Sequence, residues 1–425
     1  MQLLKIANDH RHIETETGER FYLIGDTAWE LFHRLDREEA TRYLETRREQ
    51  GFNFIHAVVL AELDGLRTPN RYGRTPLKKN AAGEYDPTMP DDAGEYSYFD
   101  HVEFILSEAE RLGLYVGLLP TWGDKYNMRW GKGPLVLNGE NAYIYAKWLA
   151  ERVKHHNNIV WILGGDRPLE CEEHFAVNDA MAKGVREGDG GKFLITLHPT
   201  GSQSSSQFVH DREWLDFNMM QSGHRTSPAP EAYEMIARDR ALTPVKPTMD
   251  GEQRYEDHPK SFKAENGYFD AADVREAMWR NLLSGACGNT YGHSSVWCMR
   301  TERTAYWPNT WEESLRRPAA EQMRHYAAFI ADNDLTAHTP TDAAVENNAR
   351  DANYVQAMVS PESVYLYIPN GIPVKLAALP FEPKSVTVFE PTTGEYHTRA
   401  AFTDGTLTFP GRGAGRGMDA VVILR

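Results

Sequence analysis

Two acidic residues stand directly after apolar runs, and together they could perform acid–base chemistry. Asp166 ends the stretch IVWILGGD, and Glu252 ends PTMDGE, 86 residues further along the chain. Hydrolysis of a glycosidic bond requires such a pair, because one carboxyl group must be protonated in order to donate to the leaving oxygen. The other must stay ionised, either to attack the anomeric carbon or to activate water. Asp166 and Glu252 are therefore candidate catalytic residues, provided that the fold brings them together.

Each acid also has a simpler interpretation on its own. An aspartate after two glycines is commonly a turn residue or a helix N-cap, and Glu252 could pair with Arg254 in DGEQRYE. The two glycines before Asp166 would remove side chains that crowd a sugar, and they allow backbone angles that other residues avoid. The catalytic hypothesis therefore depends on where the surrounding elements place the two carboxylates.

Short apolar runs alternate with longer amphipathic stretches from residue 21 to about residue 330. The expected strands are 21–25, 53–60, 114–120, 159–165, 193–199, 217–221, 246–250 and 288–293. Their continuous apolarity is typical of parallel strands buried on both faces. The expected helices are 36–51, 97–113, 139–156, 172–188, 211–216, 229–241, 271–286 and 316–333. Eight strand–helix units predict an α/β fold, a closed (β/α)8 TIM barrel, in which the fifth unit is weakest because only DREWLD is available for its helix.

The pattern changes after Thr341, where short alternating runs are separated by turn residues. Such a pattern predicts a C-terminal antiparallel β-sandwich domain. We therefore expect a barrel over residues 21–340 and a sandwich over residues 341–425. We expect the polar N-terminal segment, residues 1–20, to pack either on the sandwich or on the barrel.

Chemistry in such a barrel takes place at the C-terminal ends of the strands. The fourth and seventh strands lie nearly opposite each other, so Asp166 and Glu252 can point into one cup. Trp122 and Trp297 are candidates for its floor, because aromatic faces stack on sugar rings. Asp26 is equally consistent with an N-cap for TAWELFHRL. The full set of expected substrate-binding residues is Asp26, Trp29, Glu62, Trp122, His198, Gln221, His293 and Trp297.

Composition narrows the classes of partner. With 46 basic and 61 acidic residues the net charge is −15, so we expect no nucleic-acid partner. No apolar run is long enough to span a membrane, and the three cysteines form neither a CxxC motif nor a disulfide framework. The expected partner is an oligosaccharide or polysaccharide substrate, with no cofactor and no metal. The N-terminus shows no signal-like apolar region, which leaves two expectations: a cytoplasmic protein, or a periplasmic or secreted one whose signal has been removed.

Three stretches, GDTAWELFHRLDREEATRYLETRREQGFNFI, ILGGD and KPTMDGEQRYE, together resemble the apiosidase-like glycoside hydrolases (glycoside hydrolase family 140). The resemblance spans most of the expected barrel, and the C-terminal segment resembles the small β-sandwich domain that accompanies it. It implies a retaining, exo-acting enzyme that releases the terminal pentose apiose from rhamnogalacturonan-II side chains of plant pectin. By motif, it implies that Asp166 is the acid/base and that Glu252 is the nucleophile.

Two other classes stay open at the level of sequence. A metal-dependent barrel hydrolase could use His198, His224 and His293 with Asp250, although such barrels typically carry HxH after the first strand, where this chain reads GDT. The HxH motif that is present, His10 to His12, precedes the first strand. A non-catalytic carbohydrate-binding protein, in which the sandwich binds the sugar, is the second alternative.

Overall fold

Eight parallel strands form the centre of the protein in a computed structural model, which describes residues 1–226 and 231–425. They are β4 (Leu23–Thr27), β5 (Phe54–Leu60), β8 (Tyr115–Thr121), β9 (Ile159–Gly164), β10 (Ile195–His198), β12 (Asn218–Gln221), β13 (Thr248–Asp250) and β14 (Gly288–Tyr291). Their order in the sheet is β10-β9-β8-β5-β4-β14-β13-β12, followed by the short antiparallel strand β11 (Gln203–Ser204). Between β10 and β12 the Thr196 hydroxyl donates to the Phe217 carbonyl at 2.7 Å. The expected (β/α)8 barrel is confirmed.

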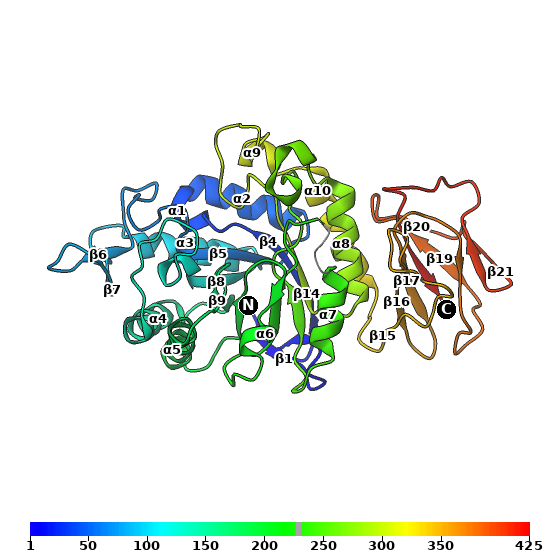
Figure 1. The fold of residues 1–425 in the computed structure, drawn as a ribbon, viewed down its shortest axis with the longest axis horizontal. Coiled ribbons are helices and arrows are strands. Elements are labelled where there is room, and N and C mark those ends of the chain that lie inside the picture. The colour runs from blue at the N-terminus through cyan, green and yellow to red at the C-terminus, as the bar shows by residue number, and fades with distance from the viewer. Residues whose placement is uncertain (227–230) are drawn as a thin grey trace.

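Helices surround this barrel on its outer side (Figure 1). They are α1 (Leu31–Arg34), α2 (Arg37–Glu49), α3 (Tyr98–Arg111), α4 (Gly139–Val153), α5 (Glu172–Asp189), α6 (Ser206–Val209), α7 (Ala232–Arg240), α8 (Ala271–Leu283), α9 (Trp311–Ser314) and α10 (Pro318–Asp332). Capping boxes at Asp36, Ser97, Asn138 and Asp270 begin four of them. In the described part of the chain, no helix is both long enough and apolar enough to cross a membrane.

The helices of two units differ from the expectation. The segment 211–216 is not helical, and the short helix α6 precedes it instead. Asp216 explains the difference, because its backbone N–H donates to the Ile195 carbonyl at 2.9 Å while its carboxylate accepts from the Ile195 N–H at 2.6 Å. These two bonds tie the end of this turn-rich segment to β10. The helix expected over 229–241 begins at Ala232, and residues 229–230 lie outside the described part.

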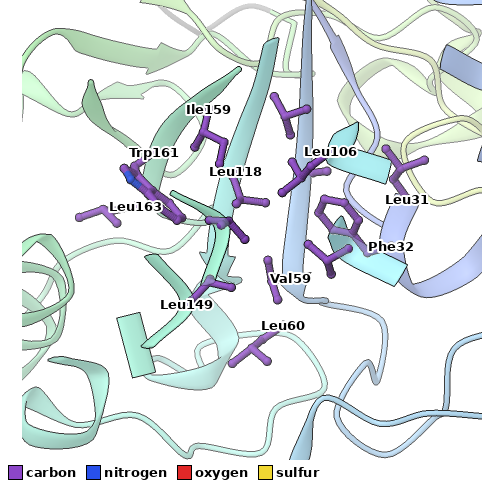
Figure 2. Close-up of a cluster of buried hydrophobic side chains, with 14 of the residues drawn as sticks. Leu31, Phe32, Val59, Leu60, Leu106, Leu118, Leu149, Ile159, Trp161 and Leu163 are labelled. Carbon is purple, nitrogen blue, oxygen red and sulfur yellow. The ribbon is translucent and has the colours of Figure 1, made fainter. Parts of the chain in front are cut away.

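An apolar layer between the strands and the outer helices holds the barrel together. Figure 2 shows side chains of α1, β5, β8 and β9, with Leu106 of α3 and Leu149 of α4, meeting in this layer. Trp161 of β9 belongs to it and is fully buried, and its indole N–H donates to Asp189 at 2.8 Å. Every residue of β5 and β8 is buried, as expected of parallel strands covered on both faces.

The first 21 residues form a separate antiparallel sheet of β1 (Leu4–Ile6), β2 (Ile13–Thr15) and β3 (Arg20–Phe21). Leu4 and Ile13 share an apolar cluster with Leu23 and Phe54, which lie at the beginnings of β4 and β5. This small sheet therefore lies at the end of the barrel opposite to the carboxyl ends of its strands. It leaves the carboxyl ends open.

Long loops at those carboxyl ends build the walls of a cup. The loop after β5 carries a hairpin of β6 (Leu77–Lys79) and β7 (Tyr85–Pro90) that projects from the barrel (Figure 1). A one-turn helix, Gly123–Lys125, opens the loop after β8. Two further one-turn helices, Lys260–Phe262 and Ala264–Asn266, lie in the loop after β13.

The C-terminal region folds as two antiparallel sheets, as expected for a β-sandwich. One sheet has the order β15 (Thr339–Pro340), β16 (Gln356–Val359), β17 (Val364–Ile368), β23 (Ala420–Leu424), β19 (Val386–Phe389), β20 (Tyr396–His397). The other consists of β18 (Val374–Lys375), β22 (Thr406–Thr408) and β21 (Ala401–Thr403). Val364, Leu366, Val422 and Leu407 are among the side chains buried between the two sheets.

The larger sheet of the sandwich packs on α8 and α10 of the barrel through an apolar cluster (Figure 1). Trp279 lies at its centre, with its ring centroid 5.1 Å from that of Tyr326 and 5.6 Å from that of Phe389. Arg275 of α8 forms a buried ion pair with Asp419 at 2.5 Å. The sandwich is therefore fixed to the barrel wall, beside the cup rather than over it.

Candidate active site

Three consecutive residues with positive φ turn the chain at the end of β9 and aim Asp166. The φ angle is 87° at Gly164, 109° at Gly165 and 52° at Asp166. A Cβ atom on Gly164 would lie 2.3 Å from the His198 carbonyl, and one on Gly165 would lie 2.6 Å from the Gly123 nitrogen. The expected unusual backbone angles are confirmed. The space that the glycines leave is taken up by neighbouring backbone, and not by the cup. A positive φ is uncommon outside glycine, and such residues cluster at functional sites.

Two donors contact the Asp166 carboxylate. The Trp130 indole N–H donates to Oδ2 at 3.3 Å, and a guanidinium nitrogen of Arg167 lies 3.4 Å from the same oxygen. The other terminal nitrogen of Arg167 lies 3.4 Å from Oε1 of Glu62. The Arg167 side chain is fully buried, whereas that of Asp166 is 25% exposed to the cup. One guanidinium therefore links two carboxylates.

Glu252 lies two residues beyond β13, in a turn fixed by Asp250. The buried Asp250 carboxylate accepts from the Ser222 hydroxyl at 2.7 Å, from the Asn281 amide at 3.1 Å and from the backbone N–H of Glu252 at 3.3 Å. Asp250 therefore acts on the backbone and not on the cup. The Glu252 side chain reaches two imidazoles: His224 Nε2 donates to Oε1 at 2.9 Å, and His198 Nε2 lies 3.2 Å from Oε2.

The environments of Asp166 and Glu252 move their pKa values apart. Burial, followed by the nearby charge of Glu252, raises the pKa of Asp166 to about 6. Burial also pushes the pKa of Glu252 upward, but His198 and His224 outweigh it and hold that pKa well below its usual range. Two carboxyl groups tuned in opposite directions provide one proton donor and one stable anion.

One cavity of about 450 Å³ receives both carboxylates. Of the residues predicted from sequence, it brings together Trp29, Glu62, Trp122, Asp166, Gln221, Glu252 and Trp297. Trp29 and Trp122 are each only 2% exposed and lie at 5.0 Å between ring centroids, so they form a fixed aromatic floor. Such a surface, flanked by a few polar groups, suits the apolar face of a sugar ring.

Asp26 does not line the cavity, nor does it cap a helix. Its fully buried carboxylate accepts from Arg47 and from the Tyr43 hydroxyl of α2, each at 2.5 Å. Alternate residues of a strand face opposite sides, and Asp26 falls on the side that meets α2. The expectation of sugar binding is therefore corrected to a buried ion pair that ties β4 to α2.

The two predicted histidines also lie outside the cavity lining. His198 is fully buried beneath Glu252 and contacts that carboxylate. His293 is fully buried as well, and its Nε2 lies 3.1 Å from Asp257 while its Nδ1 accepts from the Ser295 N–H at 3.0 Å. Both are corrected from substrate contact: His198 acts on Glu252, and His293 belongs to the supporting structure of the loops.

The residues considered for a metal site are not gathered around one point. His198 and His224 face Glu252, His293 faces Asp257, and Asp250 holds a backbone turn. Across residues 1–226 and 231–425, no group of three or more His, Cys, Asp or Glu side chains is arranged to hold a metal ion. The metal-hydrolase alternative requires these residues to converge on one metal ion, whereas their contacts are divided among Glu252, Asp257 and a backbone turn.

Several cavity residues were not predicted as substrate contacts, and they lie in loops, some two to four residues past a strand end and others much further along. They are Trp130, Thr200, Gly201, Ser202, Gly223, His224, Arg225, Tyr255, His258, Phe262 and Tyr306. Aromatic and histidine residues recur in the loops after β8, β13 and β14, and that enrichment is the signal the sequence offers. It does not say which of them turn inward.

Comparisons with known proteins agree with this geometry. The family described as "Apiosidase-like, catalytic domain" matches residues 7–337. A solved glycoside hydrolase is 26% identical with a TM-score of 0.88, covering 100% of this chain and 96% of its own. A family 5 glycoside hydrolase from Bacteroides vulgatus has the same identity and TM-score, with 99% and 93% covered. No curated protein matches the chain.

A more distant structure shares the fold alone. The α-amylase from Geobacillus thermoleovorans is 11% identical with a TM-score of 0.58, covering 95% of this chain and 98% of its own. The family match spans most of the chain, and the structures at 26% identity extend along nearly all of it. This chain belongs to the apiosidase-like family and is a glycoside hydrolase with a TIM-barrel catalytic domain.

Proposed function

We propose that the enzyme hydrolyses its substrate with retention of anomeric configuration, with Asp166 as acid/base and Glu252 as nucleophile. One observation carries the proposal: the two carboxyl groups line a single cavity while their pKa values are shifted in opposite directions. Asp166 is the group that holds a proton more readily, and Glu252 is the group that stays ionised. These are the properties that the two steps of a double displacement require.

In the first step, the Asp166 carboxyl group donates its proton to the glycosidic oxygen as the bond to the anomeric carbon breaks. A carboxylate oxygen of Glu252 attacks that carbon from the other face and forms a covalent glycosyl ester. The hydrogen bond from His224 orients Glu252 for this attack. The leaving alcohol departs neutral, because it carries the proton from Asp166.

In the second step, ionised Asp166 accepts a proton from water, whose oxygen attacks the anomeric carbon and breaks the ester. The structure supplies a reason for the change of role at Asp166. The charge of Glu252 contributes to the raised pKa of Asp166. That charge disappears when Glu252 becomes an ester. The pKa of Asp166 should therefore fall in the intermediate, although burial continues to raise it.

For the substrate, we propose a terminal apiose on a rhamnogalacturonan-II side chain of plant pectin. Membership of the apiosidase-like family supports this choice of sugar. The aromatic floor is consistent with a sugar ring of any kind as the ligand. The polar residues around the floor, including Gln221 and Ser202, can form hydrogen bonds with the hydroxyl groups of the sugar.

A sugar-release assay tests the proposal. Pectin side chains are incubated with the wild type and with Glu252→Gln, the released sugars are identified, and NMR follows the anomeric configuration of the first product. We expect free apiose in the configuration of the substrate, and none with the variant. Release of a different sugar would contradict the substrate, and a first product of inverted configuration would contradict the mechanism.

A further inference from the structure

Trp130 is the most exposed of the tryptophans that line the cavity. Trp29 and Trp122 are each 2% exposed, whereas Trp130 lines the same cavity with 40% of its surface exposed. It therefore presents a large aromatic face at the rim, beyond the floor. Exposed tryptophans that line a cavity offer an apolar surface to a ligand without requiring the chain to fold around it.

The position of the Trp130 ring is fixed by its neighbours. The Arg167 guanidinium lies 4.5 Å from the ring centroid, and Arg167 Nε donates to the Trp130 carbonyl at 3.0 Å. Asp124 accepts from the backbone N–H groups of Lys132 and Gly133 at 3.0 and 2.8 Å, which holds the segment that follows. The Trp130 ring is therefore prepared before substrate arrives, which lowers the entropy cost of binding.

The contact between Trp130 and Asp166 indicates on which side of the cleaved bond the Trp130 ring lies. A general acid must reach the glycosidic oxygen, so the groups beside it face the leaving group, while the nucleophile faces the opposite side of the anomeric carbon. The Trp130 indole N–H donates to Asp166 Oδ2 at 3.3 Å. Glu252 instead contacts His198 and His224.

We infer that Trp130 is the platform of the leaving-group subsite, where a second sugar ring stacks during hydrolysis. This inference rests on the proposed roles of Asp166 and Glu252, and it makes Trp130 a specificity-determining residue. The substrate must then carry a sugar ring, and not merely a small alcohol, next to the bond that is cleaved.

Two substrates that share the bond but differ in the leaving group test this platform. One is a pectin-derived oligosaccharide ending in apiose, and the other is methyl apioside. Both leaving groups are alcohols that need the proton of Asp166, and methanol, the less acidic of the two, needs it at least as much. A disturbance of that carboxyl group therefore does not lower kcat/KM selectively for the oligosaccharide. We expect Trp130→Ala to lower kcat/KM for the oligosaccharide about tenfold more than for methyl apioside. Equal losses on both substrates would overturn the inference.

Two matched variants separate the ring from its surroundings. Trp130→Phe keeps an aromatic face but loses the N–H donated to Asp166, so it should preserve most of the ratio between the two substrates. Met128 is 42% exposed in the same segment and does not line the cavity, so Met128→Ala should leave the ratio unchanged. A ratio that falls about tenfold in Met128→Ala would assign the effect to the loop and overturn the inference.

A binding measurement keeps this inference distinct from the proposed function. The indole N–H signal of Trp130, identified by its absence in Trp130→Phe, is followed by NMR while pectin-derived oligosaccharides are added. We expect this signal to shift on binding even if the wild type releases no apiose from either substrate. An absence of apiose release would contradict only the proposed sugar. Saturable binding with no change at this signal would contradict the platform.

Discussion

His224 and Glu252 form a hydrogen bond inside the cavity, with His224 Nε2 donating to Glu252 Oε1 at 2.9 Å. His198 lies at 3.2 Å from the other carboxylate oxygen, so the buried anion has an imidazole beside each oxygen. This arrangement explains how Glu252 can remain ionised although it is only 6% exposed. An isolated buried carboxylate would instead take up a proton.

We predict that His224→Ala moves the acidic limb of the kcat/KM profile to higher pH. Without the imidazole that lowers it, the pKa of Glu252 is governed more strongly by burial, which raises it. Glu252 would then become protonated, and inactive as a nucleophile, at a pH where the wild-type group is still ionised. A pH–rate series checks this prediction, and an acidic limb identical in both proteins would refute it.

The alkaline limb of the same profile should report Asp166. Because burial and then the charge of Glu252 raise the pKa of Asp166 to about 6, its proton is present below that pH and is lost above it. We therefore predict that kcat/KM falls about tenfold per pH unit above about pH 6. An alkaline limb near pH 8 would instead indicate that Glu62 is the proton donor, because burial raises the pKa of Glu62 to about 8.

Asp26→Asn should destabilise the fold without weakening substrate binding. The substitution leaves Arg47 charged and fully buried without its partner, which costs about 3–5 kcal/mol. Urea unfolding measures this cost, and KM should stay near the wild-type value because Asp26 does not line the cavity. Asp64→Asn is the matched control, since its pair with Arg67 is exposed and contributes at most about 1 kcal/mol. A raised KM with unchanged stability would restore the sugar-binding role.

Arg275→Ala should weaken the attachment of the sandwich to the barrel. It leaves the Asp419 carboxylate buried without its ion pair, at a cost of about 3–5 kcal/mol. Because one apolar cluster spans both parts, we expect the protein to unfold in a single transition at lower temperature. Arg416→Ala removes an exposed pair with Asp270 between the same parts and should cost about 1 kcal/mol or less. A separate sandwich transition in the wild type would contradict this prediction.

The barrel was predictable from sequence because buried parallel strands are continuously apolar and because their helices carry clear caps. Asp36 and Ser97, for example, both begin helices with capping boxes. The fifth unit was not predictable, since Asp216 uses its backbone and its carboxylate to bond β10. The helix propensities of single residues do not account for hydrogen bonds to a strand elsewhere in the chain.

The candidate site was predictable where residues directly follow strands, as Asp166 and Glu252 do. Asp26 was misassigned because the alternation of side chains along a strand depends on its register, which a short apolar run such as FYLIG does not define. Trp130 was missed because the direction of its ring depends on Arg167, which lies over the ring and donates to the Trp130 carbonyl, and on Asp124, which holds the following residues Lys132 and Gly133. Those contacts arise only once the loops after β8 and β9 meet.

The identity of the nucleophile can be tested by trapping the glycosyl ester. The enzyme is incubated with a 2-deoxy-2-fluoro glycosyl fluoride of the released sugar, digested, and mapped by mass spectrometry to find the labelled peptide. We predict one label per chain, on Glu252, and none when Glu252→Gln is treated in the same way. A label on another carboxylate, or turnover with inversion and no covalent label, would contradict the pairing of Asp166 with Glu252.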